Sequence, residues 1–210
     1  LGLEFYIGLP DRVNRNRLAH IHCWSSRAEM LLHLHTIPPR LIVSMFNPRS
    51  LSGRAFNLPG AGFLEAFNSE EIRVVEMPAA NGTGTARSVA RLYGSAAIGS
   101  PDLALSPGVR DALETPATPP TGGLRDKVLH IDTRFSLGFI KPFSKFVFGS
   151  SEKAFGTPGV GGSFGFADPD TGIGFAYVMN RMGFHVWNDP RELALRQALL
   201  HDVLGARPQS

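Results

Sequence analysis

The stretch from Phe155 to Asn180 constrains the fold more than any other part of the chain, because turn chemistry separates two runs of strand composition. The runs are 162–167 (GSFGFA) and 173–179 (IGFAYVM), which are rich in Phe, Tyr, Val and Ile. Between them, residues 168–172 (DPDTG) combine a proline that fixes φ, an aspartate that caps its own turn and a glycine that accepts a positive φ. The stretch therefore predicts a β-hairpin with residues 168–172 as its connection.

The segment just before this hairpin is unusually rich in glycine. Residues 155–162 (FGTPGVGG) contain four glycines, and each costs about 0.5–1 kcal/mol inside a strand. Glycines in a strand also let a ligand or another backbone approach closely. Two interpretations stay open: a bulged, poorly packed edge, or a strand whose edge faces a substrate.

Capping residues, prolines and hydrophobic spacing predict helices over much of the first half. The expected helices are 11–19, a second from Ser25 or Ser26 to before Pro38, one or two turns at 63–67, 85–93, and 107–113. Gly94 should weaken the continuation of the 85–93 helix, and residues 50–62 and 115–123, rich in glycine and proline, are expected to be loops.

The second half predicts consecutive antiparallel strands followed by a closing helix. The strands are 134–140, 155–163, 162–167 and 173–180, and a helix over 189–203 starts with Asp189 as its cap and Pro190 at its first position. This order indicates an α+β fold, an antiparallel β-sheet flanked by helices with a helical N-terminal part. We expect one domain over 1–210, mostly helix and loop in 1–130, with the strands and the closing helix in 131–210.

Composition excludes several function classes. The formal net charge is +3, and the 17 arginines against 4 lysines are scattered, so a nucleic-acid surface is not indicated. The single cysteine, Cys23, cannot form an internal disulfide, and no run of 18 apolar residues or signal peptide is visible. These features lean towards a cytoplasmic protein without a membrane span.

Four further features could carry chemistry. Ser150-Ser151-Glu152-Lys153 spells S-x-x-K, a serine–lysine spacing of acyl-transfer enzymes, but no helix is expected there to fix the pair, so we interpret it as a solvated loop. Two H-x-H pairs are surface or half-buried histidines in this interpretation and not a metal site; the residues are His20, His22, His33 and His35. His185 is expected to be structural, and the glycines around Gly159 precede a hairpin rather than a helix, which argues against a phosphate loop.

Three segments resemble the β-lactamase-related serine hydrolases, which include class C β-lactamases, DD-peptidases and esterases. The most specific is 161–180 (GGSFGFADPDTGIGFAYVMN), which is similar to the glycine-rich hairpin that follows the family's third motif, K-T-G or H-x-G. The segments 78–93 (PAANGTGTARSVARLY) and 1–10 (LGLEFYIGLP) resemble a loop and helix beside the site and the end of the family's helical region.

The resemblance places a third-motif strand in this chain and puts the catalytic serine–lysine and tyrosine motifs before Leu1. Thr157 stands where the family has Lys or His, Gly159 matches the motif glycine, and the backbone N–H of Val160 is expected to donate to the oxyanion. These three are the candidate catalytic residues, and Asn81, Gly161 and Gly162 are the candidate substrate-binding residues. The resemblance implies no cofactor and no metal.

The expected function is therefore ester or amide hydrolysis through an acyl-enzyme in a longer protein, most like the esterase branch, with this chain inactive by itself. The alternatives are a non-catalytic, penicillin-binding-like scaffold or binding module, and a truncated gene product. The expected partners are a small ester or amide substrate, and either the N-terminal half of the same domain or a second copy bound through an open sheet edge.

Overall fold

The computed structural model describes the chain apart from residues 24–32, 34–35, 57–63, 120 and 207–210. Its centre is an antiparallel sheet in which consecutive strands pair in chain order. The strands are β3 (Phe135–Ser136), β4 (Phe139–Ile140), β5 (Phe155–Pro158), β6 (Phe164–Asp168) and β7 (Ile173–Tyr177). The hairpin expected within 155–180 is present, with Asp168 opposite Ile173 at its turn.

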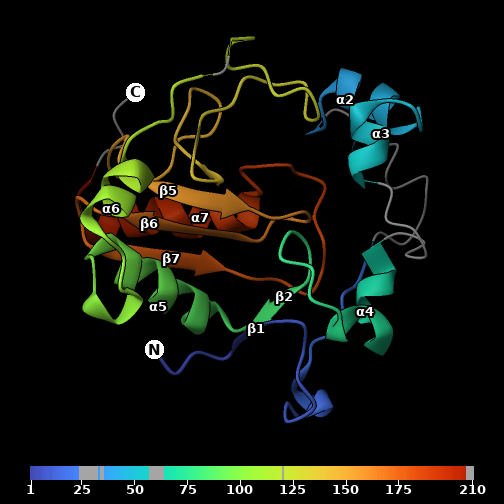
Figure 1. Cartoon of the computed structure of the whole chain (residues 1–210), viewed down its shortest axis with the longest axis horizontal. Helices are drawn as coiled ribbons and strands as arrows, with labels where there is room; N and C mark the ends of the chain where they lie inside the picture. Colours follow the sequence, from blue (N-terminus) through green and yellow to red (C-terminus); the bar gives the residue numbers. More distant parts are fainter. Residues whose placement is uncertain (24–32, 34–35, 57–63, 120, 207–210) are drawn as a thin grey trace.

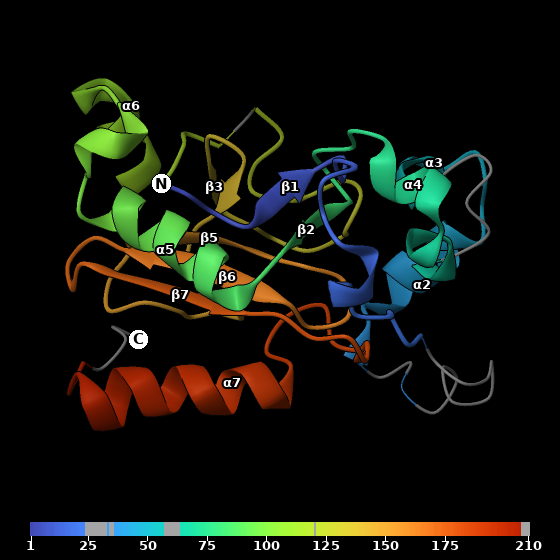
Figure 2. The same ribbon diagram turned by 90° about the horizontal axis from the view of Figure 1, so that it is seen from below.

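Helices lie on both faces of this sheet (Figures 1 and 2). One face is covered by α5 (Ala86–Ala97), with α6 (Pro107–Glu114) at its end, and the opposite face by α7 (Pro190–Gln197), which continues as the π-helical segment η5 (Ala198–Val203). The expected α+β architecture is therefore confirmed. No helix in the described part of the chain is both long enough and apolar enough to cross a membrane.

The strand β6 separates two hydrophobic clusters, because alternate residues point to opposite faces. On the α7 face, Phe164 and Phe166 pack with Phe146 and Phe148. On the α5 face the chain keeps side chains small, and a Cβ atom at Gly165 would lie 2.5 Å from the Tyr93 ring. Glycine at 165 therefore lets α5 lie close against the sheet.

A second glycine pair explains why α5 does not stop where the sequence suggested. We expected Gly94 to weaken the helix, yet α5 runs through it to Ala97. A Cβ atom at Gly174 of β7 would overlap the backbone of Gly94, so helix and strand meet backbone to backbone. Tertiary packing outweighs the roughly 1 kcal/mol that glycine costs in a helix.

The first half is built from short elements around a two-stranded antiparallel ribbon, β1 (Phe5–Ile7) with β2 (Gly82–Gly84). The remaining elements are the 3-10 turns η1 (Arg15–Arg17), η3 (Leu64–Asn68) and η4 (Pro101–Leu103) and the helices α2 (Pro39–Met45), α3 (Leu51–Phe56) and α4 (Glu70–Val74). In Figure 1 these helices lie to one side of the sheet, beyond the carboxyl end of β5.

Several expected boundaries were wrong. The helix expected over 11–19 shrinks to the single turn η1, which Asn14 caps instead of Asp11. Part of the segment expected as loop over 50–62 is the helix α3. Most of the helix expected from Ser25 or Ser26 lies outside the described residues. The predicted strand 134–140 is a hairpin, and the predicted strand 155–163 ends at Pro158.

The closing helix begins as expected, since the Asp189 side chain accepts from the Arg191 backbone N–H and Pro190 occupies the first turn. Leu200 on this helix is buried, at 2% exposure, while Leu193 and Leu204 are half-buried. The family resemblance also predicted an open apolar strip around these three leucines, left by an absent N-terminal helix, and the burial of Leu200 contradicts that prediction.

Candidate active site

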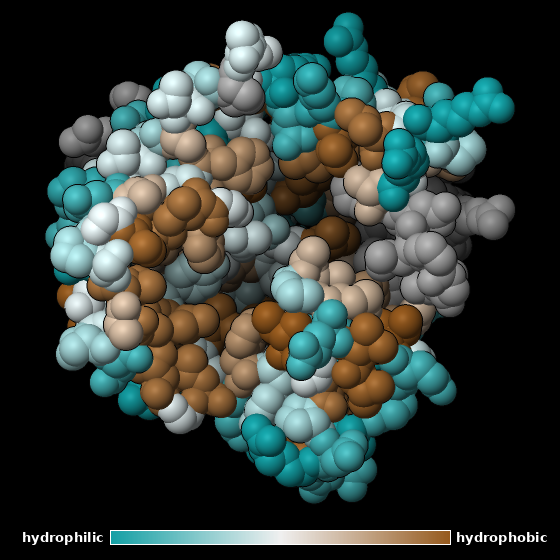
Figure 3. Space-filling view, viewed as in Figure 1, coloured by the Kyte–Doolittle hydropathy of each residue, from teal (hydrophilic) through white to brown (hydrophobic). Residues whose placement is uncertain are grey.

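The candidate site is the tip of the β5–β6 hairpin. Thr157 pairs with Gly165 across the two strands, and both face α5. On β5's other edge, β4 pairs only at Gly156, opposite Ile140, so the edge of Thr157 and Pro158 is unpaired within the described residues. The space-filling view is hollowed just beyond the carboxyl end of β5, between the hairpin tip and β2 (Figure 3).

The tip itself is a tight β-turn. The Gly162 N–H donates to the Gly159 carbonyl at 3.2 Å, which closes a four-residue turn. Gly161 has φ +87°, the value that the third residue of a type II turn requires. Val160 is the second residue, whose N–H has no acceptor within such a turn, and its side chain is 56% exposed. Within the described residues, the Val160 N–H has no backbone acceptor and lies in an exposed residue of the turn.

The exposed side chain of Thr157 lies beside Tyr93 of α5. The Thr157 side chain lies close to the Tyr93 phenol and interacts with it. Burial raises the pKa of the Tyr93 phenol, and the neighbouring Thr157 offsets only part of that rise. Tyr93 is therefore a neutral phenol near neutral pH, suited to hydrogen bonding rather than to acting as a base. In the sequence, Tyr93 is only an apolar position of an amphipathic helix, so no sequence pattern indicates its contact with Thr157.

Residues at the start of α7 support the Gly159–Gly162 turn from the α7 face of the sheet. Arg191 donates to both carboxylate oxygens of Asp189 at 2.8 Å, and to the carbonyls of Gly161 (3.1 Å) and Arg181 (2.8 Å). Burial raises the pKa of Asp189, but hydrogen bonds and charge from Arg191 outweigh this, and the pKa lies below its ordinary value. Asp189 and Arg191 therefore form a charged pair against the hairpin.

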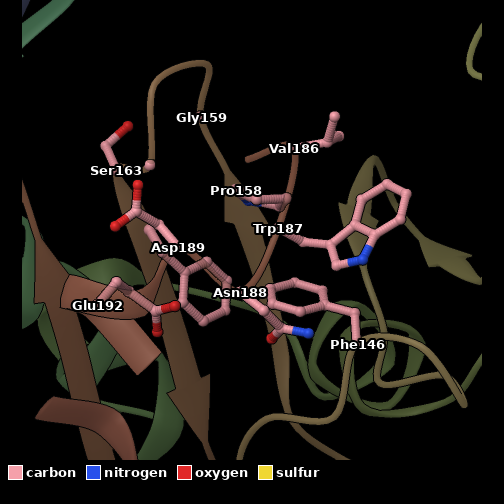
Figure 4. Close-up of a pocket in the computed structure, with 11 residues that line it drawn as sticks. Phe146, Pro158, Gly159, Ser163, Val186, Trp187, Asn188, Asp189 and Glu192 are labelled. Atoms are coloured by element: carbon pink, nitrogen blue, oxygen red, sulfur yellow. The ribbon is translucent and has the colours of Figure 1, made fainter. Parts of the chain in front are cut away.

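Figure 4 shows a small pocket on the α7 face of the hairpin. Its lining includes Phe146, Pro158, Trp187, Asp189 and Glu192. Both carboxylates are already engaged, Asp189 by Arg191 and Glu192 by Arg196. This pocket is therefore part of the support of the hairpin, with no unpaired acid or base to offer a substrate.

The structure brings five of the six predicted site residues together: Thr157, Gly159, Val160, Gly161 and Gly162 lie on one hairpin tip. The two buried glycines have steric roles there. A Cβ atom at Gly161 would lie 2.7 Å from the Met182 side chain, and one at Gly162 would lie 2.5 Å from the Asp189 carboxylate. Packing and positive φ therefore account for both, and substrate contact is not needed to explain them.

The structure gives Asn81 a different role from substrate binding. Asn81 is 7% exposed, and its amide donates to the carbonyls of Ile72 (2.9 Å) and Val75 (2.5 Å). Its oxygen accepts from the Met77 N–H at 3.1 Å. The side chain thus fixes the loop between α4 and β2, and a sequence match to a family segment could not reveal that it is turned inwards.

The S-x-x-K pattern is a loop, as expected. The Ser150 hydroxyl donates to Asp168 at 3.0 Å, whereas the Lys153 ammonium pairs with Asp170 at 2.9 Å. Among the described residues, no group of three or more His, Cys, Asp or Glu side chains could hold a metal ion. His20 and His22 make an edge contact, with ring centroids 4.9 Å apart, and His35 lies outside the described residues.

Comparison with known proteins gives the class. The family model described as Beta-lactamase matches residues 18–200, which is most of the chain. The chain belongs to this family, and its fold is that of the β-lactamase-related serine hydrolases, as the hairpin motif predicted.

Particular relatives are named as esterases or penicillin-binding homologues. The chain is 36% identical over 134 residues to Esterase/beta-lactamase LipL of Mycobacterium tuberculosis, covering 61% of this chain and 29% of that protein. EstA from Arthrobacter nitroguajacolicus Rue61a has a TM-score of 0.75 at 26% identity, covering 97% of this chain and 50% of that one. A penicillin-binding protein homologue from Caulobacter crescentus has a TM-score of 0.68 at 31% identity, covering 93% of this chain and 47% of that one. A family VIII carboxylesterase has a TM-score of 0.63 at 28% identity, covering 93% of this chain and 46% of that one. The chain thus spans half or less of the length of these relatives.

Proposed function

We propose that this chain forms one wall of a serine hydrolase active site that cleaves esters or amides through an acyl-enzyme. The single observation that carries the proposal is the hairpin tip, where a strand edge that is unpaired within the described residues and the exposed residue Val160 lie beside a hollow. A backbone amide such as that of Val160 can stabilise the oxyanion that forms when a serine oxygen attacks the carbonyl carbon, a contribution of roughly 3–4 kcal/mol per donor.

The nucleophilic serine, and the lysine and tyrosine that move protons, belong in this proposal to the N-terminal half of the same domain. The attacking serine oxygen would displace an alcohol or amine, and water would then release the acid from the acyl-enzyme. The separate engagement of Ser150 and Lys153 by two aspartates supports this assignment, because neither side chain reaches the other. The esterase names of two relatives favour an ester substrate.

A second candidate is a binding module without catalysis. Thr157 occupies the position of a basic residue in the third motif, and its side chain lies close to the Tyr93 phenol. A threonine there supplies a hydrogen bond but no positive charge and no proton-accepting amine or imidazole.

An ester assay tests both candidates. We expect the 210-residue chain to hydrolyse p-nitrophenyl acetate and butyrate no faster than buffer, and to gain turnover when combined with the N-terminal half of its domain. Turnover by the chain alone that Ser150→Ala abolishes would make Ser150 and Lys153 the catalytic pair and overturn the assignment. An assembled domain that binds a reactive ester or β-lactam probe without turnover would favour the binding module.

A further inference from the structure

The tip of the candidate site is held from beneath by one ion pair. We propose that Arg191 and Asp189 are positioning residues that hold the Gly159–Gly162 turn in the form that presents the Val160 amide. This inference rests on the proposed function of that amide. The part that concerns the shape of the turn can be tested without any measurement of activity.

The first step of the argument is the convergence of hydrogen bonds on one carbonyl. The Gly161 oxygen accepts from the Gly183 N–H at 2.7 Å and from the Arg191 guanidinium at 3.1 Å. Gly161 is the third residue of the turn, with φ +87°. Fixing this carbonyl fixes the plane of the Gly161–Gly162 peptide, which also carries the Gly162 N–H that closes the turn on the Gly159 carbonyl.

The second step is steric. The Asp189 carboxylate fills the space beside Gly162, where a Cβ atom would lie 2.5 Å from Oδ2, and it also fills the space beside Gly183. Asp189 is 3% exposed and receives two hydrogen bonds from the Arg191 side chain. The buried carboxylate keeps the guanidinium in place, and the guanidinium keeps the carboxylate charged.

The third step separates this pair from the helix cap that the sequence predicted. Capping needs only the bond from the Arg191 backbone N–H to Asp189, at 3.1 Å. The guanidinium adds bonds to Gly161 on one segment and to Arg181 on another. These two carbonyls come from chain segments 20 residues apart, so the side chain ties the hairpin tip to the segment that follows β7 and to α7.

The structural half is tested on the chain alone by hydrogen–deuterium exchange of the peptide covering 159–163. We expect Arg191→Ala to raise exchange of these amides about tenfold or more, Arg191→Lys to have an intermediate effect, and Arg87→Ala, at an exposed arginine of α5, to have none. A thermal melt checks that each variant is folded. Unchanged exchange in folded Arg191→Ala would overturn the proposal.

The functional half is tested on the assembled domain. We expect Arg191→Ala to lower kcat at least tenfold with KM within about twofold, approaching the roughly 100- to 1,000-fold loss that follows removal of a whole oxyanion donor. Millimolar guanidinium should restore part of kcat, whereas sodium chloride of equal ionic strength should not. Faster exchange with unchanged kcat would overturn the positioning role. Absence of turnover in the assembled wild type would instead contradict the proposed function, leaving the exchange result to decide whether the pair holds the turn.

Discussion

Lys141 shows, at the scale of one residue, how this fold accommodates a buried charge. It is fully buried, and its ammonium donates to the carbonyls of Leu113 (2.9 Å), Glu114 (2.8 Å) and Lys153 (2.8 Å). The first two carbonyls end α6, where a positive charge is favourable. Burial nevertheless lowers the pKa of Lys141 to about 8, with Glu114 and Glu152 opposing that shift.

This pKa makes stability depend on pH in a defined direction. Between about pH 8 and the ordinary lysine pKa, the unfolded chain keeps a proton that the folded chain has lost, so the unfolding free energy rises with pH. Urea unfolding of wild type against Lys141→Met should therefore shift in favour of wild type by about 2 kcal/mol between pH 7 and pH 9.5. The matched variant at exposed Lys127 should show no such trend. A difference for Lys141→Met that is the same at both pH values would contradict the prediction.

The candidate residues that the sequence grouped correctly are the ones that are contiguous in it. Thr157 and Val160 are three residues apart, so the sequence grouped them even though it predicted one strand over 155–163 and missed the turn that follows Pro158. Tyr93 and Arg191 reach that tip from other elements, and Asn81 turns away from solvent towards the loop that it fixes. Side-chain direction and long-range contact depend on packing, which a motif does not specify.

At the scale of elements, caps and turns were predictable where local chemistry decides, as in the start of α7 at Asp189 and Pro190 and of α6 at Ser106 and Pro107. The segment 134–140 was predicted as one strand because Phe, Leu and Ile dominate it. It folds as a hairpin since Leu137 and Gly138 both adopt positive φ, 44° and 88°, the pattern of a type I′ turn. A leucine there hides the turn, because Asn or Gly is the usual signal.

This strained turn can be improved. Leu137 is 60% exposed, so its replacement loses little packing, and Asn tolerates a positive φ better than Leu. We expect Leu137→Asn to raise the unfolding free energy by about 0.5–1 kcal/mol. The control Leu195→Asn, at a 54% exposed position inside α7, should lower stability by a few tenths of a kcal/mol or more, because asparagine is the poorer helix former. Chemical denaturation of the three proteins measures both; a loss of stability in Leu137→Asn would show that the leucine side chain matters to packing.

At the scale of the whole molecule, the sheet is covered on both faces but ends abruptly. In the described part of the chain, β7 pairs only with β6, and its other edge has no strand partner. The family resemblance predicted this open edge. It also predicted an apolar strip on the closing helix, which is wrong because Leu200 is buried; the large exposed apolar side chains there are Leu195 and Val203. Unpaired backbone N–H and C=O groups along a strand are a template for another strand.

We therefore expect the isolated chain to self-associate through β7. Val178, directly after β7, is 44% exposed, so Val178→Lys adds a charge at this edge at little cost in packing. Size-exclusion chromatography over a range of concentrations should show wild type shifting to larger species and Val178→Lys staying monomeric. Val203→Lys, at a 73% exposed position on η5, has the same change in charge away from the edge and should behave as wild type. If both lysine variants abolish association equally, net charge rather than the strand edge controls it; if wild type is monomeric at every concentration, the open edge is protected and the chain is self-contained.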